Sequence, residues 1–203
     1  MKIICVGRNY ASHAQELGNE VPKEPALFLK PETALIAKRQ PFFIPDFSND
    51  IHYEAEVVIK INRLGKNIQA KFASKYYDKV ALGIDFTARD LQKKLKEKGL
   101  PWEKSKAFDG SAAVGRFVDV KHFVDIQNVR FSLAVNKEVK QNGKTSEMVF
   151  SINQLIEYIS TFFTLKIGDL IFTGTPAGVG SVTKNDFLEL YLEDDLNLSL
   201  TVK

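Results

Sequence analysis

The sequence contains a single cysteine, Cys5, so no disulfide can form within its 203 residues. This excludes a disulfide-stapled fold and favours a reducing compartment, the cytoplasm. Long apolar runs are also missing, because none approaches the roughly 18–20 residues that a membrane span requires. The apolar run at residues 3–6 breaks at Gly7 and Arg8, which does not fit a secretory signal. We therefore expect a cytoplasmic protein without a membrane segment.

Several binding motifs are absent as well: there is no phosphate-binding loop, dinucleotide fingerprint, paired CxxC or HExxH zinc motif. The charge is also nearly balanced, with 28 Lys and Arg against 25 Asp and Glu, a net +3. Lysines cluster between residues 93 and 106, but acids stand among them, which favours a solvated helix face over nucleic-acid binding. The hydrophobic fraction of 44% supports one packed core. We expect a single domain over residues 1–203.

Strand patterns dominate the second half of the sequence. Apolar and polar residues alternate over residues 129–135 and 196–202, which is typical of strands with one buried face. Residues 171–172 and 187–192 indicate further strands between Gly- and Pro-containing turns. Many strands with a few separate helices predict an α+β fold.

Helix signals are fewer. Ser151 precedes Gln154 by three residues, which is a capping-box spacing. The apolar stripe predicted for this helix consists of Leu155, Ile156, Ile159, Phe162 and Phe163. Thr87 and Asp90 have the same spacing, and predict a helix that turns Leu91 and Leu95 inward and ends near Gly99. A shorter helix is expected over residues 11–17.

The strongest chemical signal is a group of acidic residues. His52, Glu54 and Glu56 alternate along a predicted strand, so their side chains share one face. That face could be solvated, but the following residues 57–59 are all apolar and indicate burial. Asp85 ends the apolar run 80–84. Three converging carboxylates would suit Mg²⁺, Mn²⁺ or Ca²⁺ and leave coordination positions open for substrate.

Other residues could bind or convert an anionic substrate near these acids. His13 and Glu16 share a helical face, so Glu16 could orient His13 as a general base, although the residues alone favour an ordinary exposed pair. Arg89 and Gln92 are neighbours on the helix after Asp85. Lys106 lies in a stretch predicted to be irregular, from which it could reach inward.

The glycine-rich run at residues 174–180 has two interpretations. It could be a tight turn that needs positive φ angles. Alternatively, its backbone N–H groups and the Thr175 hydroxyl could hold an anion such as a carboxylate.

Taken together, these segments resemble the fumarylacetoacetate hydrolase family, specifically its short single-domain members of the acylpyruvase and oxaloacetate decarboxylase type. The matching stretches are VGRNYASH at 6–13, FLKP at 28–31, YEAE at 53–56, DFTARD at 85–90, GLPW at 99–102 and TGTPAGVG at 173–180. They follow one another in the expected order from residue 6 to residue 180, so the resemblance covers nearly the whole chain.

The resemblance implies a mixed β-roll with a few peripheral helices, assembled as a homodimer. It implies that Mg²⁺ or Mn²⁺ is held by Glu54, Glu56 and Asp85, which agrees with the independent interpretation of the acids. It further implies a water-activating pair, His13 and Glu16, and a lysine, Lys106, that contacts the reacting oxyanion. The positions implied to bind substrate are Arg8, Arg89, Gln92 and Thr175.

The function expected from this resemblance is hydrolysis of a C–C bond in an acylpyruvate, a 2,4-dioxo acid, by way of a pyruvate enolate. Decarboxylation or keto–enol tautomerisation of oxaloacetate would use the same site and are the alternatives. A further alternative is a module that binds 2-oxo acids without turning them over. The expected partner is therefore a small-molecule 2-oxo acid.

Overall fold

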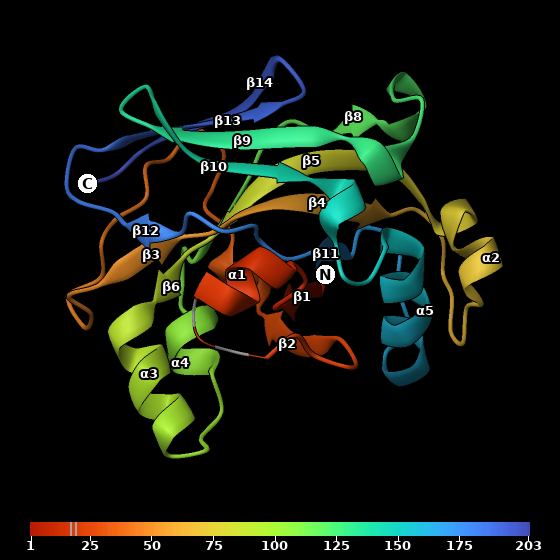
Figure 1. Ribbon diagram of the computed structural model, residues 1–203, viewed down its shortest axis with the longest axis horizontal. Coiled ribbons are helices and arrows are strands. Elements are labelled where there is room, and N and C mark those ends of the chain that lie inside the picture. Colours follow the sequence, from red (N-terminus) through yellow and green to blue (C-terminus); the bar gives the residue numbers. More distant parts are fainter. Residues whose placement is uncertain (17, 19) are drawn as a thin grey trace.

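Strands make up most of the computed structural model, which describes residues 1–16, 18 and 20–203 (Figure 1). The strands are β1 (Ile3–Gly7), β2 (Ala26–Lys30), β3 (Ile51–Tyr53), β4 (Ala55–Ile61), β5 (Tyr77–Asp85), β6 (Thr87–Ala88), β7 (Ala112–Val114), β8 (Val118–Asp119), β9 (Arg130–Val135), β10 (Glu138–Lys144), β11 (Leu170–Phe172), β12 (Gly180–Ser181), β13 (Phe187–Leu192) and β14 (Asp195–Thr201).

Helices are short and lie between the strands. The α-helices are α1 (Ala11–Glu16), α2 (Ala70–Ala73), α3 (Arg89–Glu97), α4 (Glu103–Lys106) and α5 (Ile152–Phe162). Single 3₁₀ turns are found at η1 (Glu32–Ala34), η2 (Ser74–Tyr76), η3 (Val120–His122), η4 (Ile126–Asn128) and η5 (Thr145–Glu147). The predicted α+β class and mixed β-roll are confirmed by this arrangement.

Three sheets share the strands. The largest, of seven strands, has the order β2-β1-β11-β4-β5-β7, and β8 pairs with β5 beside it. It is mixed, because β1 runs parallel to β11 whereas β4 is antiparallel to both β11 and β5. A four-stranded sheet has the order β10-β9-β13-β14, and a small one has the order β12-β3-β6.

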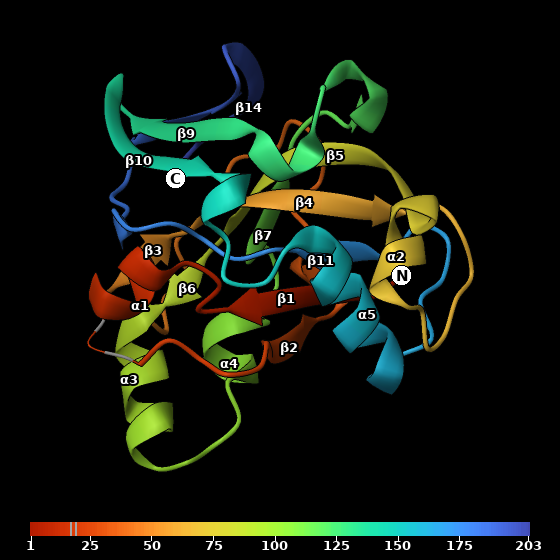
Figure 2. The ribbon, with the colours of Figure 1, turned by 45° about the vertical axis from the view of Figure 1, so that its right-hand side comes forward.

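The sheets are arranged in layers around the core. The four-stranded sheet lies over β4 and β5, whereas α3 and α4 lie on the opposite side, and α2 and α5 lie away from them (Figures 1 and 2). Strand β4 sends Val57 and Ile59 into the larger apolar cluster and Val58 into a smaller one behind it. Strand β4 is therefore buried on both faces, as its run of apolar residues predicts.

The strands expected at 129–135, 171–172, 187–192 and 196–202 are confirmed, with small shifts at their ends, as β9, β11, β13 and β14. Helix α5 begins as predicted, since Ser151 and Gln154 form a complete capping box. The predicted stripe of α5 is only partly correct: Leu155, Ile156 and Ile159 are buried, but Phe162 is 58% exposed. Phe162 is the last residue of the helix, and the next residue, Phe163, is partly buried against the core.

The predicted start of α3 is wrong. Thr87 belongs to strand β6, and the helix begins at Arg89 without a side-chain cap. Asp90 instead accepts a hydrogen bond from the Ser48 hydroxyl at 2.6 Å. Gln92 is the buried residue of α3, whereas Leu91 and Leu95 are half-buried. Thr87 and Ala88 pair with β3 as a strand, so Thr87 does not occupy the N-cap position of the helix.

The helix expected at residues 11–17 is present as α1, and its predicted last residue, Leu17, lies outside the described residues. Among the described residues, no helix combines the length and apolar character needed to cross a bilayer.

Candidate active site and metal centre

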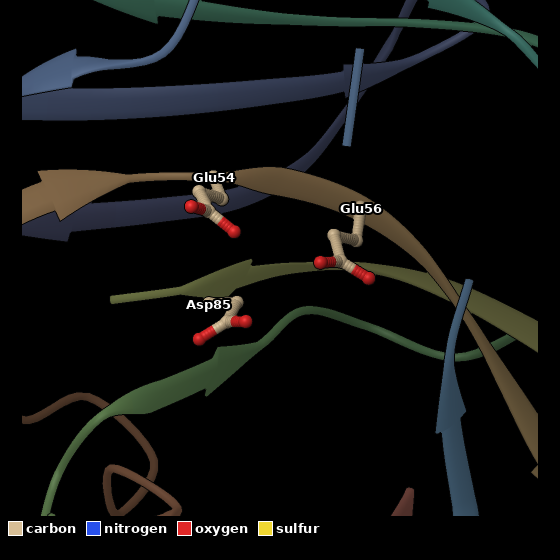
Figure 3. Close-up of side chains that lie close together, drawn as sticks. All are labelled: Glu54, Glu56 and Asp85. Carbon is tan, nitrogen blue, oxygen red and sulfur yellow. The ribbon is translucent and has the colours of Figure 1, made fainter. Parts of the chain in front are cut away.

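Three buried carboxylates meet at one end of the β4–β5 pair. Glu54 stands at the break between β3 and β4, Glu56 lies on β4, and Asp85 ends β5. The backbone N–H of Asp85 donates to the carbonyl of Glu54 at 2.9 Å, which aligns the two chain segments. Each acid offers one oxygen, and these oxygens lie within 4.8 Å of one another (Figure 3). Because residues 54 and 56 alternate with Ala55, both side chains leave the same face of the sheet.

Cationic side chains neutralise part of this cluster. Lys106 Nζ donates to Glu54 Oε2 at 2.7 Å and to Asp85 Oδ2 at 2.8 Å. Arg89 donates to the other oxygen of Glu54, Oε1, at 2.5 Å. Lys30 Nζ forms an ion pair with Asp85 Oδ1 at 2.8 Å. Both carboxylates therefore have a cation on each oxygen, at 0–6% side-chain exposure.

Glu56 has a different environment. Its Oε2 accepts a hydrogen bond from the backbone N–H of Gly174 at 2.7 Å, and within the described chain it has no ion pair with a lysine or arginine. Burial, together with the negative charges of Asp85 and Glu54, raises the pKa of Glu56 well above its usual range. Glu54 is buried too, but Lys106 and Arg89 outweigh that burial and hold its pKa below the usual range. Glu56 is therefore the acid of the cluster whose negative charge is not balanced by a neighbouring cation.

The donor set fits a hard divalent cation. Three carboxylate oxygens close together and shielded from water are ligands that Mg²⁺ and Mn²⁺ accept. A cation between them would compensate Glu56, whose charge is otherwise opposed by its neighbours. The residues that could hold it are Glu54, Glu56 and Asp85, the predicted set.

His13 and Glu16 form a pair beside the acids. His13 Nδ1 lies 3.2 Å from Glu16 Oε2, and His13 is 5% exposed. A carboxylate at Nδ1 favours a proton there and leaves Nε2 free to accept one. The other oxygen of Glu16 accepts a hydrogen bond from the backbone N–H of Gly178 at 2.9 Å. The imidazole is thus held in an orientation suited to a general base.

The glycine-rich segment supports both predicted interpretations. Gly174 and Gly178 have φ angles of 102° and 97°, in the region that favours glycine. Their N–H groups hold carboxylates, as described, but these belong to Glu56 and Glu16 of the protein itself. The segment therefore links the acid cluster to the His13–Glu16 pair.

One pocket brings the predicted site residues together. Its lining includes the three acids and the predicted residues Arg8, His13, Arg89, Gln92, Lys106 and Thr175. Glu16 does not line the pocket but contacts Nδ1 of His13. His52 does not join the acids: its Nε2 contacts Asp50 at 2.9 Å, because its strand β3 belongs to the small sheet. The stretch around Lys106, predicted to be irregular, is the helical turn α4.

The comparison with known families identifies the family of the chain. The family model described as fumarylacetoacetate (FAA) hydrolase C-terminal matches residues 2–202. The chain belongs to the fumarylacetoacetate hydrolase family. Its relatives include the mitochondrial oxaloacetate decarboxylase of Dictyostelium discoideum, which is of one of the two types named in the sequence-based resemblance.

Relatives within the fumarylacetoacetate hydrolase family are enzymes by name. Oxaloacetate tautomerase YcgM of Escherichia coli (strain K12) is 45% identical over 188 residues, which are 92% of this chain and 86% of that protein. The mitochondrial oxaloacetate tautomerase FAHD1 of Mus musculus is 42% identical over 201 residues, 99% of this chain and 91% of that protein. The crystal structure of fumarylpyruvate hydrolase from Pseudomonas aeruginosa in complex with Mn²⁺ and pyruvate has a TM-score of 0.94 and 35% identity, and the match covers 100% of this chain and 89% of that one.

Two residues of this family member's site were missed by the sequence-based prediction. Lys30 is fully buried and also donates to the Ser111 hydroxyl at 3.0 Å and to the carbonyl of Lys106. Its position at the end of an apolar segment could have indicated burial. Gln141 is 1% exposed, and its amide donates to the Thr175 hydroxyl at 2.9 Å. It follows an irregularity in β10, which the sequence pattern does not reveal.

Proposed function

We propose that this protein catalyses the metal-dependent keto–enol tautomerisation of oxaloacetate. The observation that carries the proposal is a buried base, His13, which contacts Glu16 and faces the same pocket as the acid cluster. Tautomerisation moves one proton between C3 and the oxygen on C2, so a single positioned base is the essential group. The names of the Escherichia coli and mouse relatives support oxaloacetate as the substrate.

The metal would be Mg²⁺ or Mn²⁺, held by Glu54, Glu56 and Asp85. When bound, such a cation supplies Lewis-acid polarisation of the substrate's 2-oxo oxygen. Mn²⁺ in the Pseudomonas aeruginosa structure supports this assignment.

The remaining pocket residues would bind and orient the 2-oxo acid. Lys106 keeps its proton, because Asp85 and Glu54 raise its pKa despite its burial. Its ammonium group can therefore stabilise negative charge that develops on a substrate oxygen. Arg89 and Gln92 are joined by a 2.7 Å hydrogen bond and present two donors on one side of the pocket. Thr175 accepts from Gln141, which leaves its hydroxyl proton for the substrate.

His13 would move the proton. With Nδ1 engaged by Glu16, Nε2 takes a proton from C3 of the keto form, and a proton is returned to the oxygen on C2 to give the enol. The reverse transfer regenerates the keto form, so no atom is lost or gained. Burial of His13 protects this exchange from bulk water.

Hydrolysis of a C–C bond in acylpyruvates, the main expectation from the sequence, is the second candidate. It is supported by the fumarylpyruvate hydrolase among the solved relatives, and by a base that could equally deprotonate water. The names of the relatives favour the oxaloacetate alternative over it.

The test is a proton NMR assay with Mg²⁺ and three substrates in parallel: oxaloacetate, acetylpyruvate and fumarylpyruvate. We expect accelerated exchange between the keto and enol signals of oxaloacetate. Formation of pyruvate with CO₂ release would identify a decarboxylase, and cleavage of an acylpyruvate would identify a hydrolase. Binding of these acids without any conversion would leave the non-catalytic module and refute the proposal.

The cytoplasmic location, the single domain over residues 1–203 and the homodimer expected from the sequence stay predictions. Light scattering of the purified protein tests the dimer, for which a mass of twice 22.9 kDa is expected.

A further inference from the structure

Two cations in the active-site pocket have no partner in the ion-pair network described above. The pocket lining includes Arg8, Arg89, Lys96 and Lys106. Lys106 and Arg89 are paired with the acids. In the part of the chain that the structure describes, neither Arg8 nor Lys96 forms an ion pair. The pocket thus contains positive charge that the protein itself does not compensate.

Lys96 lines the pocket and is partly buried. Arg89, Gln92 and Lys96 stand at positions i, i+3 and i+7 of helix α3, and therefore share one face. Gln92 is buried and Lys96 is half-buried, whereas the neighbouring Lys93 and Lys94 are exposed. The ammonium group of Lys96 lies 5.5 Å from the centre of the Trp102 ring, a cation–π distance.

Arg8 lines the same pocket as Lys96 and is itself in an uncommon backbone conformation. Its φ angle is 60°, in the left-handed region that residues other than glycine rarely adopt. Burial, with the charges of Arg8 and Arg89, lowers the pKa of Lys96. Like charges kept together in a pocket point to an anion that binds between them.

We propose that Lys96, with Arg8, binds the second carboxylate of a four-carbon dicarboxylic 2-oxo acid. The inference rests on the proposed function, because it assumes that the first carboxylate and the 2-oxo oxygen occupy the end of the pocket with the acid cluster. A monocarboxylic acid of the same length leaves Lys96 and Arg8 uncompensated. Lys96 therefore sets the preference of the pocket for a dianion over a neutral acyl group.

The test compares two acids of equal chain length, oxaloacetate and 2-oxobutyrate, which carry a carboxylate and a methyl group at C4. Trp102 is the single tryptophan of the chain and lines the same pocket. Its fluorescence therefore reports binding of either acid, whether or not the acid is converted. Both acids are titrated with Mg²⁺ into the wild-type protein, Lys96→Met and Lys93→Met. The Lys93 variant removes an exposed lysine from the same helix and serves as the matched control.

For Lys96→Met we expect the Kd of oxaloacetate to rise about 10- to 100-fold, the range for a lost hydrogen bond to a charged group. The Kd of 2-oxobutyrate is expected to stay within about twofold, since it makes no such bond. Lys93→Met is expected to behave as the wild type. Equal weakening of both acids, no change in either, or equal affinity of the wild type for the two would each overturn the inference.

Turnover is measured separately, by the enol absorbance of oxaloacetate. A wild-type protein that binds oxaloacetate in preference to 2-oxobutyrate but does not interconvert its forms refutes the proposed function. In that case the ratio of Kd values in Lys96→Met still decides the role of Lys96.

Discussion

Lys106 shows how the site holds three negative charges in a buried pocket. Its ammonium group contacts Glu54, Asp85 and the Thr87 hydroxyl, and Lys30 and Arg89 take the outer oxygens of the two acids. A buried charge is tolerated only when it is paired. Glu56 is the exception among the three acids, and a divalent cation would complete the balance.

Substitution of Glu56 tests this assignment. For Glu56→Gln we expect Mn²⁺ affinity to fall by more than about 100-fold, because a charged oxygen ligand is replaced by a neutral one. Calorimetric titration with Mn²⁺ measures the change, and oxaloacetate turnover is expected to fall with it. Glu97→Gln, which removes an exposed acid from α3, is the control. Unchanged Mn²⁺ binding by Glu56→Gln would contradict the ligand assignment.

His13 can be separated from metal binding. For His13→Gln we expect kcat for tautomerisation to fall by about 10²–10⁴, the range for loss of a general base. Mn²⁺ affinity is expected to stay unchanged, since His13 is not among the acids. Decarboxylation, which needs no attacking water and no proton taken from C3, is expected to be spared more than hydrolysis. Equal losses of decarboxylation and hydrolysis would count against the role of His13 as a base.

At the residue scale, most of the candidate site was predictable from the sequence. Acids at alternate strand positions and an acid after an apolar run are local patterns, and they led to Glu54, Glu56 and Asp85. Lys30 and Gln141 were not found, because their roles depend on contacts to residues 34–76 positions away in the sequence. No local spacing carries that information.

The glycine-rich segment after β11 connects the two halves of the site. At Gly174 a Cβ atom would lie 2.6 Å from Cβ of Asn9, in addition to the strain of its φ angle. Asn9 cannot withdraw easily, because its amide donates to the carbonyls of Phe150 and Thr173. The backbone N–H that holds Glu56 therefore depends on a residue without a side chain.

Gly174→Ala is expected to lower the free energy of unfolding by more than about 1–3 kcal/mol, the cost of the φ strain alone. Gly168→Ala is the matched control, since Gly168 has a φ of 89° but open space around its Cβ position. Urea unfolding measures both variants, and the difference between them isolates the contact with Asn9. Weaker Mn²⁺ binding is expected only for Gly174→Ala. Identical behaviour of the two variants would contradict the close approach.

At the scale of elements, the sequence predicted the existence of strands and helices better than their ends. The capping box of α5 was correct because both partners lie within one turn. The same spacing failed at Thr87, because pairing of β6 with β3 depends on a strand more than 30 residues earlier. Tertiary pairing of this kind overrides a local helix signal.

An ion pair also links the N-terminal segment to the residues just before β11. Asp169, which is 1% exposed, accepts hydrogen bonds from the backbone N–H groups of Lys2 and Lys166, each at 2.8 Å, and pairs with the Lys2 ammonium group. Burial opposes ionisation of Asp169, but these donors outweigh it and lower its pKa. Because the folded pKa lies below the unfolded one, the ionised carboxylate stabilises the fold above pH ~4.

This stabilisation is lost as the pH falls through the folded pKa. For Asp169→Asn we expect the free energy of unfolding at pH 7 to fall by about 1–3 kcal/mol. The difference from the wild type is expected to shrink as the pH approaches ~3 and below. Urea unfolding at pH 7, 5 and 3 measures it. A difference that stays constant across this range would show that the carboxylate charge is not involved.

A metal that binds the folded state but not the unfolded state also raises the stability of the whole molecule. We expect the Tm to increase with Mg²⁺ or Mn²⁺ concentration and to return when EDTA is added; at a concentration 100 times Kd the gain is about 2.7 kcal/mol. Differential scanning calorimetry measures it. The shift is expected to disappear in Glu56→Gln, and its persistence there would place the metal elsewhere.

The parallel pairing of β1 with β11 affects how the protein is made. Ile3 lies opposite Leu170, so β1, the first strand synthesised, cannot pair with β11 until the much later residues of β11 have left the ribosome. Glu56 likewise waits for Gly174. We expect the nascent chain to be unable to bind a divalent cation at the three acids until residue 174 has emerged, so that the pocket forms late in biosynthesis.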